Sequence, residues 1–170
     1  MDTGKKARES IATLSQVMMP HHASHHGSVH GGVIMQLVDE VAYVAASRHA
    51  RRNVATASID SFSFENPVHV GDVISLRAEL TFVGKTSMEI EVHVETEKVI
   101  TGEVLFVAAA SLTMVALDEK GRPTPVPRLI LENEEQRKKY EEAVVRREQR
   151  LRRLKVESSS KGDYSDPSYR

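Results

Sequence analysis

Apolar residues recur at helical spacing in one long segment, residues 33–50. They are Ile34, Leu37, Val38, Val41, Val44 and Ala45. Positions three and four apart lie on one face of a helix, so this spacing predicts a helix. Asp39, Glu40 and Arg48 are the only acidic or strongly basic residues in the segment. A helix with so few charges is expected to be largely buried.

Alternating apolar and polar positions predict strands around this helix. Residues 73–83 and 87–96 are apolar at every second position, as in strands with one face on the core and one toward water. Residues 9–19 and 54–64 also favour strands, and the apolar run 103–117 predicts a central one. The separators are turn-like: Asn66-Pro67, Gly71-Asp72, Gly84-Lys85 and Thr101-Gly102. We therefore predict an α+β fold, with an antiparallel sheet wrapped around one long central helix.

A different composition begins near residue 121 and divides the chain. The predicted domain covers residues 8–120, and a stiff Pro-rich exit and a charged helical tail cover residues 121–157. Within this tail, residues 132–155 favour a helix with a sparse apolar stripe, formed by Tyr140, Val144, Leu151 and Leu154. Residues 158–170 are polar and are expected to be disordered.

Composition excludes several kinds of chemistry. The chain has no cysteine, which excludes disulfides, cysteine-based metal sites and thiol nucleophiles and fits a reducing compartment. No stretch reaches the roughly 18 apolar residues of a membrane span, and the N-terminal residues lack an apolar signal core. We expect a cytoplasmic protein without a membrane partner.

Charge is distributed unevenly along the chain. Residues 1–120 hold ten basic and fifteen acidic residues, a net charge of −5, whereas residues 121–157 hold eleven basic and seven acidic residues, a net charge of +4. The basic excess fits either an anionic ligand or a solvated helix face. Few aromatic residues and mixed charge signs argue against nucleic acid as a partner.

Gly31 and Gly32 stand where the predicted helix starts. The N-terminus of a helix leaves backbone N–H groups unpaired and carries partial positive charge. Two glycines would let a ligand come close to these groups, so the site could hold a carbonyl oxygen that becomes negative during acyl transfer. The glycines are equally compatible with a purely structural role in tight helix entry.

Asp39 is an acidic residue flanked by Leu37, Val38 and Val41. A carboxylate in a dry, partly buried place often serves as a base or a nucleophile. The other interpretation is an ordinary hydrogen bond at the surface. Asp39 follows Gly32 by seven residues, about 10 Å along a helix axis. One thioester carbonyl could not easily touch both in a single chain, which predicts a site shared by two subunits.

Other side chains offer weaker candidates. His21, His22, His25, His26 and His30 precede the helix, but their spacing matches no defined zinc motif, so we predict no metal site and favour a polar pocket mouth or an interface. A general base among them remains an alternative. Ser24, Ser28 and Ser58 lie outside any Gly-x-Ser-x-Gly elbow, and no glycine-rich phosphate loop is present.

Three segments together resemble a known family. HGSVHGGVIMQLVDEVAYVAASRHA, VATASIDSFSFENPVHVGDVISLRAEL and GKTSMEIEVHVE, in this order, resemble the acyl-CoA thioesterases of the hot-dog superfamily. The nearest likeness is to the cytosolic long-chain acyl-CoA hydrolases and their bacterial relatives. The resemblance covers about residues 8–120.

The resemblance implies hydrolysis of acyl-CoA to a free acid and CoA, with no cofactor beyond the CoA of the substrate. It implies that a backbone N–H of Gly31 or Gly32 polarises the thioester carbonyl. Asp39 from the facing domain would then act as general base or nucleophile. Candidates for contacts with CoA are Arg48, Ser58, Asp60, Lys85, Thr86 and Ser87. The family further implies a dimer that assembles into a hexamer as a trimer of dimers.

The chain departs from the family at one position. Many relatives carry an asparagine 15 residues before the aspartate, where this chain has Ser24. A serine can still hydrogen-bond a water or a carbonyl, but turnover could be lower. The alternatives are therefore an acyl-CoA-binding hot-dog protein with weak or no activity, and another hot-dog acyl-thioester enzyme such as a dehydratase.

Overall fold

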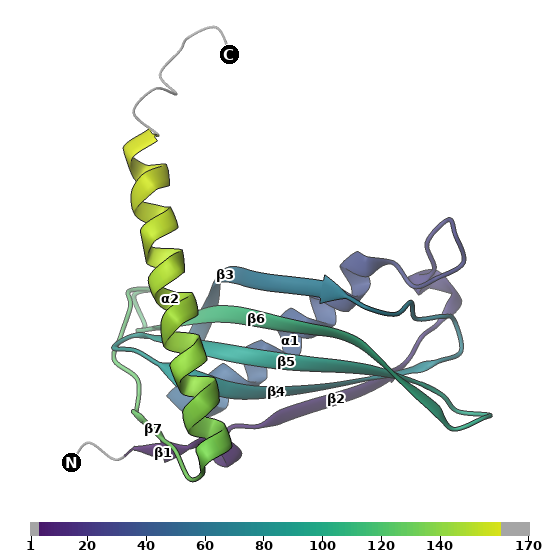
Figure 1. The fold of residues 1–170 in the computed structure, drawn as a ribbon, viewed down its shortest axis with the longest axis horizontal. Helices are drawn as coiled ribbons and strands as arrows, with labels where there is room; N and C mark the ends of the chain where they lie inside the picture. The colour runs from purple at the N-terminus through teal and green to yellow at the C-terminus, as the bar shows by residue number, and fades with distance from the viewer. Residues whose placement is uncertain (1–3, 161–170) are drawn as a thin grey trace, which may run out of the picture.

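One long helix lies against a five-stranded antiparallel sheet in the computed structural model, which describes residues 4–160 (Figure 1). The helix is α1 (Gly31–Ala50). The sheet has the order β2-β4-β5-β6-β3, from strands β2 (Ala12–Val17), β3 (Asn53–Phe64), β4 (Val73–Val83), β5 (Ser87–Lys98) and β6 (Glu103–Leu117). The predicted α+β class and the sheet around a central helix are confirmed.

The hydrophobic core lies between α1 and the sheet. The side chains of Ile34, Val38, Val41 and Ala45 are almost fully buried and belong to the main apolar cluster with residues from all five strands. The helix begins at Gly31, two residues before the predicted start. Arg51 ends it in the left-handed conformation, with φ of 52°. The apolar spacing therefore predicted the buried face of α1, except at Val44, which is 38% exposed.

Strand β3 is an edge strand and carries two irregularities. It pairs only with β6 among the described strands, and its register shifts between Thr56 and Ser58 and again between Ile59 and Ser61. A β-bulge inserts an extra residue and so interrupts the alternation of faces. Thr56 consequently lies opposite the buried Met114, on the face toward α1, whereas Ser58 lies opposite Thr113, on the other face.

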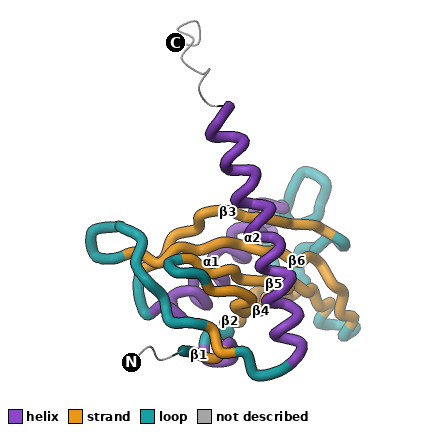
Figure 2. The backbone as a smooth tube through the Cα atoms, turned by 60° about the vertical axis from the view of Figure 1, so that its left-hand side comes forward, coloured by secondary structure: helices purple, strands orange, loops and turns teal. Residues whose placement is uncertain are grey.

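Helix α2 (Glu134–Ser160) crosses that other face, on the opposite side of the sheet from α1 (Figures 1 and 2). The prediction that one face of strand 87–96 is in contact with water is therefore wrong at Glu89, which lies beneath α2 and is only 2% exposed. Arg146 binds the Glu89 carboxylate at 2.7 Å and Lys139 binds that of Glu91 at 2.9 Å. Part of the basic excess of the tail thus neutralises acidic groups of the sheet.

Smaller elements complete the fold. Strands β1 (Lys5–Lys6) and β7 (Leu129–Ile130) form a short parallel pair, and two 3-10 helices span Ala7–Glu9 and Pro20–His22. None of these four was predicted. Helix α2 continues to Ser160, past the expected end of the helical tail, and the rest of the segment expected to be disordered lies outside the described residues. Within residues 4–160, no helix is long and apolar enough to cross a membrane.

Candidate active site

Asp39 lies in the middle of α1, half-buried, on the side of the helix below the edge strand β3. Its Oδ1 accepts a hydrogen bond of 2.6 Å from the Thr56 hydroxyl. A short bond to a charged acceptor is strong for its kind and fixes the carboxylate in one orientation. The carboxylate is thus held in place while it stays half-buried in the single chain.

A backbone N–H group at the start of α1 has no hydrogen-bond acceptor among the described residues. His30 caps the helix, and its Nδ1 accepts from the Gly32 N–H at 3.2 Å. The Val33 N–H is bound by the His30 carbonyl at 2.9 Å. Among the described residues, the Gly31 N–H has no acceptor. Of the two predicted glycines, only Gly31 therefore offers an N–H to a ligand.

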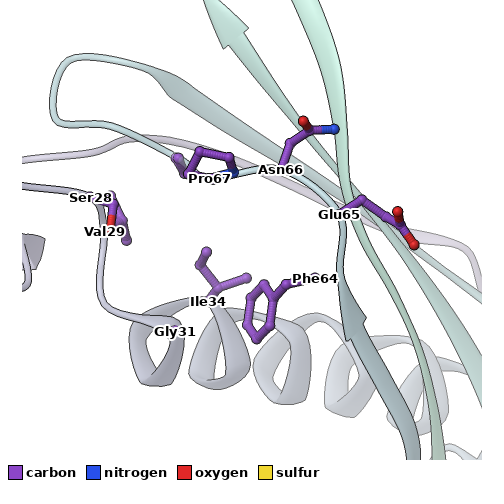
Figure 3. A pocket seen from close by; sticks show the side chains of 9 residues that line it. Ser28, Val29, Gly31, Ile34, Phe64, Glu65, Asn66 and Pro67 are labelled. Atoms are coloured by element: carbon purple, nitrogen blue, oxygen red, sulfur yellow. The ribbon is translucent and has the colours of Figure 1, made fainter. Parts of the chain in front are cut away.

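An open pocket of about 320 Å³ adjoins this helix start (Figure 3). Gly31 and Ile34 of α1 and the Phe64 ring beside them lie on one side of it, and Asn66 and Pro67 on the other. A Cβ added at Gly31 would stand 3.4 Å from the Phe64 ring, so a side chain there would narrow the opening. The pocket joins a largely apolar wall to a backbone donor, as expected of a site for an acyl group.

One chain does not bring Asp39 and Gly31 together. They are eight residues apart on the same helix, which corresponds to about 12 Å along the axis. A single carbonyl group cannot reach both. The predicted division of the site between two subunits stays a prediction, and the geometry of the single chain agrees with it.

Ser58 and Asp60 point away from this site, contrary to the prediction. Ser58 donates to Asp60 at 2.7 Å, and Arg150 of α2 binds the same carboxylate at 2.7 Å. Thr113 adds a hydrogen bond of 2.8 Å. The cause is the irregular register of β3, which turns both side chains toward α2. Both residues therefore hold α2 on the sheet.

The remaining candidates lie apart from the Gly31 pocket. Ser24 is in the loop before α1, where its Oγ accepts from the His26 N–H at 3.3 Å. Arg48, near the end of α1, donates to the Ile11 carbonyl at 2.5 Å. Lys85 and Thr86 lie in the turn between β4 and β5, and Ser87 begins β5, where it pairs with Val115. Thr56 lies at the same end of the sheet: it pairs with Met114, the residue next to Val115 on β6.

The histidines do not form a metal centre among residues 4–160, where no group of three or more potential ligands is found. His22 and His30 instead organise the loop, through His22 Nδ1 and the His30 cap. A different histidine, His49, is fully buried between Ser10 and Pro127. Burial lowers the pKa of His49 from 6.5, so it is neutral near pH 7.

Thr56 is the site residue that the sequence did not single out. Its hydroxyl reaches Asp39 across 17 positions of the chain, and nothing local marks it among the polar residues of 54–64. The available signal was weak: Thr56 is the polar one of the two residues between the apolar Val54 and the bulge.

The chain is similar to proteins of known class. A family model described as the thioesterase superfamily matches residues 26–103. An uncharacterized acyl-CoA thioester hydrolase of Bacillus subtilis is 38% identical over 146 residues, 86% of this chain and 85% of the relative. The cytosolic acyl coenzyme A thioester hydrolase of Rattus norvegicus is 41% identical over 135 residues, which are 78% of this chain but 35% of that protein.

Solved structures agree in fold. An apo-hexameric acyl-CoA thioesterase has a TM-score of 0.86 and 37% identity, over 89% of this chain and 97% of the other. The acyl-CoA hydrolase of Staphylococcus aureus, solved with butyryl coenzyme A, coenzyme A and coenzyme A disulfide, has a TM-score of 0.86 and 33% identity, over 95% and 98%.

The Staphylococcus aureus protein was also solved with an aspartate, a threonine or an asparagine replaced by alanine. In it the threonine follows the aspartate by 17 positions and the asparagine precedes it by 15. Thr56 follows Asp39 by the same 17 positions, and Ser24 stands at the asparagine spacing. By its sequence relatives and its hot-dog fold, this chain belongs to the thioesterase superfamily.

Proposed function

We propose that the protein hydrolyses fatty acyl-CoA to a free fatty acid and CoA, at a site that two copies of the chain share. The observation that carries the proposal is a fixed carboxylate, Asp39 bound by Thr56, at an open strand edge about 12 Å along the helix axis from an unpaired helix amide, that of Gly31. The relatives named as acyl-CoA hydrolases, and the butyryl-CoA complex of one of them, support the substrate class.

Dimerisation through β3 would complete the site. The outer edge of β3 has no partner strand within the described chain, and the side chains of Ala55, Ala57 and Ile59 are exposed along it. An exposed strand edge is a ready template for pairing with another chain. Pairing two copies of β3 antiparallel is the two-fold arrangement that would set Asp39 of one copy facing Gly31 of the other.

The reaction follows from these two groups. Asp39 takes a proton from a water molecule, and the water oxygen attacks the thioester carbonyl carbon. The carbonyl oxygen becomes negative and is stabilised by the Gly31 N–H at the positive end of α1. The C–S bond then breaks, the carboxylic acid leaves, and the CoA thiolate takes the proton from Asp39. Direct attack by Asp39, through an anhydride that water then opens, uses the same geometry.

Ser24 would weaken but not abolish this chemistry. It stands where the Staphylococcus aureus hydrolase has an asparagine by spacing, and its hydroxyl offers one donor where an amide offers two. The turn with Lys85, Thr86 and Ser87, at the Thr56 end of the sheet, is the proposed contact for the CoA arm. Arg48, whose guanidinium binds Ile11, is a less suitable partner.

The hexameric relatives support a further assembly of three dimers, and the cytosolic rat relative supports a cytoplasmic location. Both remain part of the proposal for this chain.

The test compares wild type with Asp39→Asn on acyl-CoAs of several chain lengths, with release of CoA thiol as the readout. Hydrolysis by wild type and at least about a thousandfold lower kcat for the variant are expected, since removal of a base or nucleophile costs several kcal/mol. Glu40→Gln is the matched control, because Glu40 is exposed and its carboxylate accepts a hydrogen bond from Gln36, away from Thr56 and Asp39. Tight acyl-CoA binding by wild type without thiol release would instead identify a binding protein.

A further inference from the structure

The sheet-facing side of α2 carries a stripe of side chains at helical spacing. Tyr140 packs on Phe82 with ring centroids 5.0 Å apart, Ala143 is fully buried, and the Arg147 guanidinium lies 5.6 Å above the Phe82 ring. The same spacing continues to Leu151 and Leu154, four and seven positions after Arg147. The stripe that holds α2 on its own sheet is therefore longer than the sheet beneath it.

Helix α2 passes the edge of the sheet at Arg150. This arginine binds Asp60 of β3, the edge strand, and the helix continues beyond it through residues 151–160 (Figures 1 and 2). We call residues 151–160 the arm. Within the arm Leu151 is 39% and Leu154 52% exposed. Two leucines on the side of a helix that faces a sheet, with no sheet below them, indicate a missing partner surface.

The length of the arm matches a continuation of the sheet. Ten helical residues extend about 15 Å. Neighbouring strands lie about 4.8 Å apart, so the arm could cover roughly three strands beyond β3. The proposed pairing of two β3 strands would place the partner's β3, β6 and β5 there.

The outer face of the sheet has a region that suits the arm. Helix α2 leaves uncovered the stretch toward the C-terminal end of β3, where Ser63, Ala109 and His93 are neighbours on adjacent strands and are exposed. Small side chains such as Ser63 and Ala109 allow a helix to lie close. Antiparallel pairing of β3 reverses the strand direction in the second copy, which brings the partner's arm to this stretch.

We propose that the arm of each subunit docks on the outer sheet face of a second copy, with Leu151 and Leu154 packed against the strip that contains Ser63 and Ala109. The proposal rests on the dimer of the proposed function. The second copy is favoured over an unrelated partner because the arm continues directly over the strand edge through which the copies would pair.

Engineered cysteines test the contact, because the natural chain has none. Leu151→Cys or Leu154→Cys is combined with Ser63→Cys or Ala109→Cys, and the isolated dimer is oxidised. At least one pair is expected to give a disulfide-linked dimer, which requires the two Cα atoms to lie within about 7 Å. The control replaces the sheet cysteine by Ile100→Cys, at a fully exposed turn, and should stay unlinked. Links that form in a hexamer but not in the isolated dimer would contradict the proposal.

A second measurement does not depend on disulfide geometry. Leu151→Ser with Leu154→Ser should raise the dimer dissociation constant at least about tenfold. Val145→Ser is the matched control, since Val145 is 53% exposed on α2 and lies outside the stripe. A stable, unlinked dimer that tolerates both serines would overturn the arm contact alone. A wild-type monomer would overturn the shared site as well.

Discussion

Replacing Thr56 by valine removes one hydroxyl and keeps the shape of the side chain. The structure gives this hydroxyl one strong role, the 2.6 Å hydrogen bond to Asp39, and a weak contact of 3.5 Å to the Met114 sulfur. A hydrogen bond to a charged group contributes about 1.5–3 kcal/mol, and the exposed position of Thr56 favours the lower end. If this energy holds Asp39 in its reactive orientation, kcat/KM should fall about tenfold.

The assay is thiol release from acyl-CoA by wild type, Thr56→Val and Thr56→Ser. Serine keeps the hydroxyl and should keep most of the activity. Because Thr56 is a positioning residue that acts through Asp39, Thr56→Val should have no further effect in an Asp39→Asn background. Equal activities of the valine and serine variants, or a full additional loss in that background, would refute this account of Thr56.

Three further predictions concern other parts of the molecule. Ser24→Asn should raise kcat severalfold in the same assay, because an amide replaces a hydroxyl at the asparagine spacing; no change or a loss would show that Ser24 is no handicap. The contribution of His49 to the free energy of unfolding should fall as the pH drops through 6.5, because the buried His49 has a lowered pKa and the unfolded chain binds the proton first; urea titrations should show a flatter pH dependence for His49→Gln, and an equal slope would contradict this origin. Arg146→Met should destabilise the fold by about 3 kcal/mol, because it leaves the buried Glu89 carboxylate without its cation; a loss in thermal denaturation no larger than that of exposed Arg137→Met would argue against the pairing.

The spacing of apolar residues and the positions of turn residues were enough to predict most of the fold. Helix α1 and the four long strands follow from apolar spacing, because side chains that share a face of a helix or strand share an environment. The prediction of a solvent-exposed face for residues 87–96 was wrong at Glu89. No local pattern in that strand indicates that a helix some fifty residues later covers this face. The short β1–β7 pair joins two segments that flank the predicted domain of residues 8–120, and it has no local pattern either.

The site was predicted less completely. Asp39 and Gly31 were singled out as candidates because a carboxylate among apolar residues and a glycine pair before a helix are unusual in themselves. Ser58 and Asp60 were misplaced because the irregular register of β3 reverses their faces, which the sequence does not reveal. The same irregularity leaves Thr56 facing Asp39.

Division of the site between subunits is the central claim, and mixed dimers test it most directly. Gly31→Pro removes the backbone donor, while proline suits the first position of a helix and His30 already has the extended conformation that a following proline requires. Asp39→Asn and Gly31→Pro should each be inactive as homodimers. After the two variants are denatured together and refolded, half of the dimers should be mixed, and each mixed dimer should hold one intact site of two. The account predicts recovery of about a quarter of wild-type activity. No recovery from dimers shown to be mixed would contradict it, because both groups would then act within a single chain.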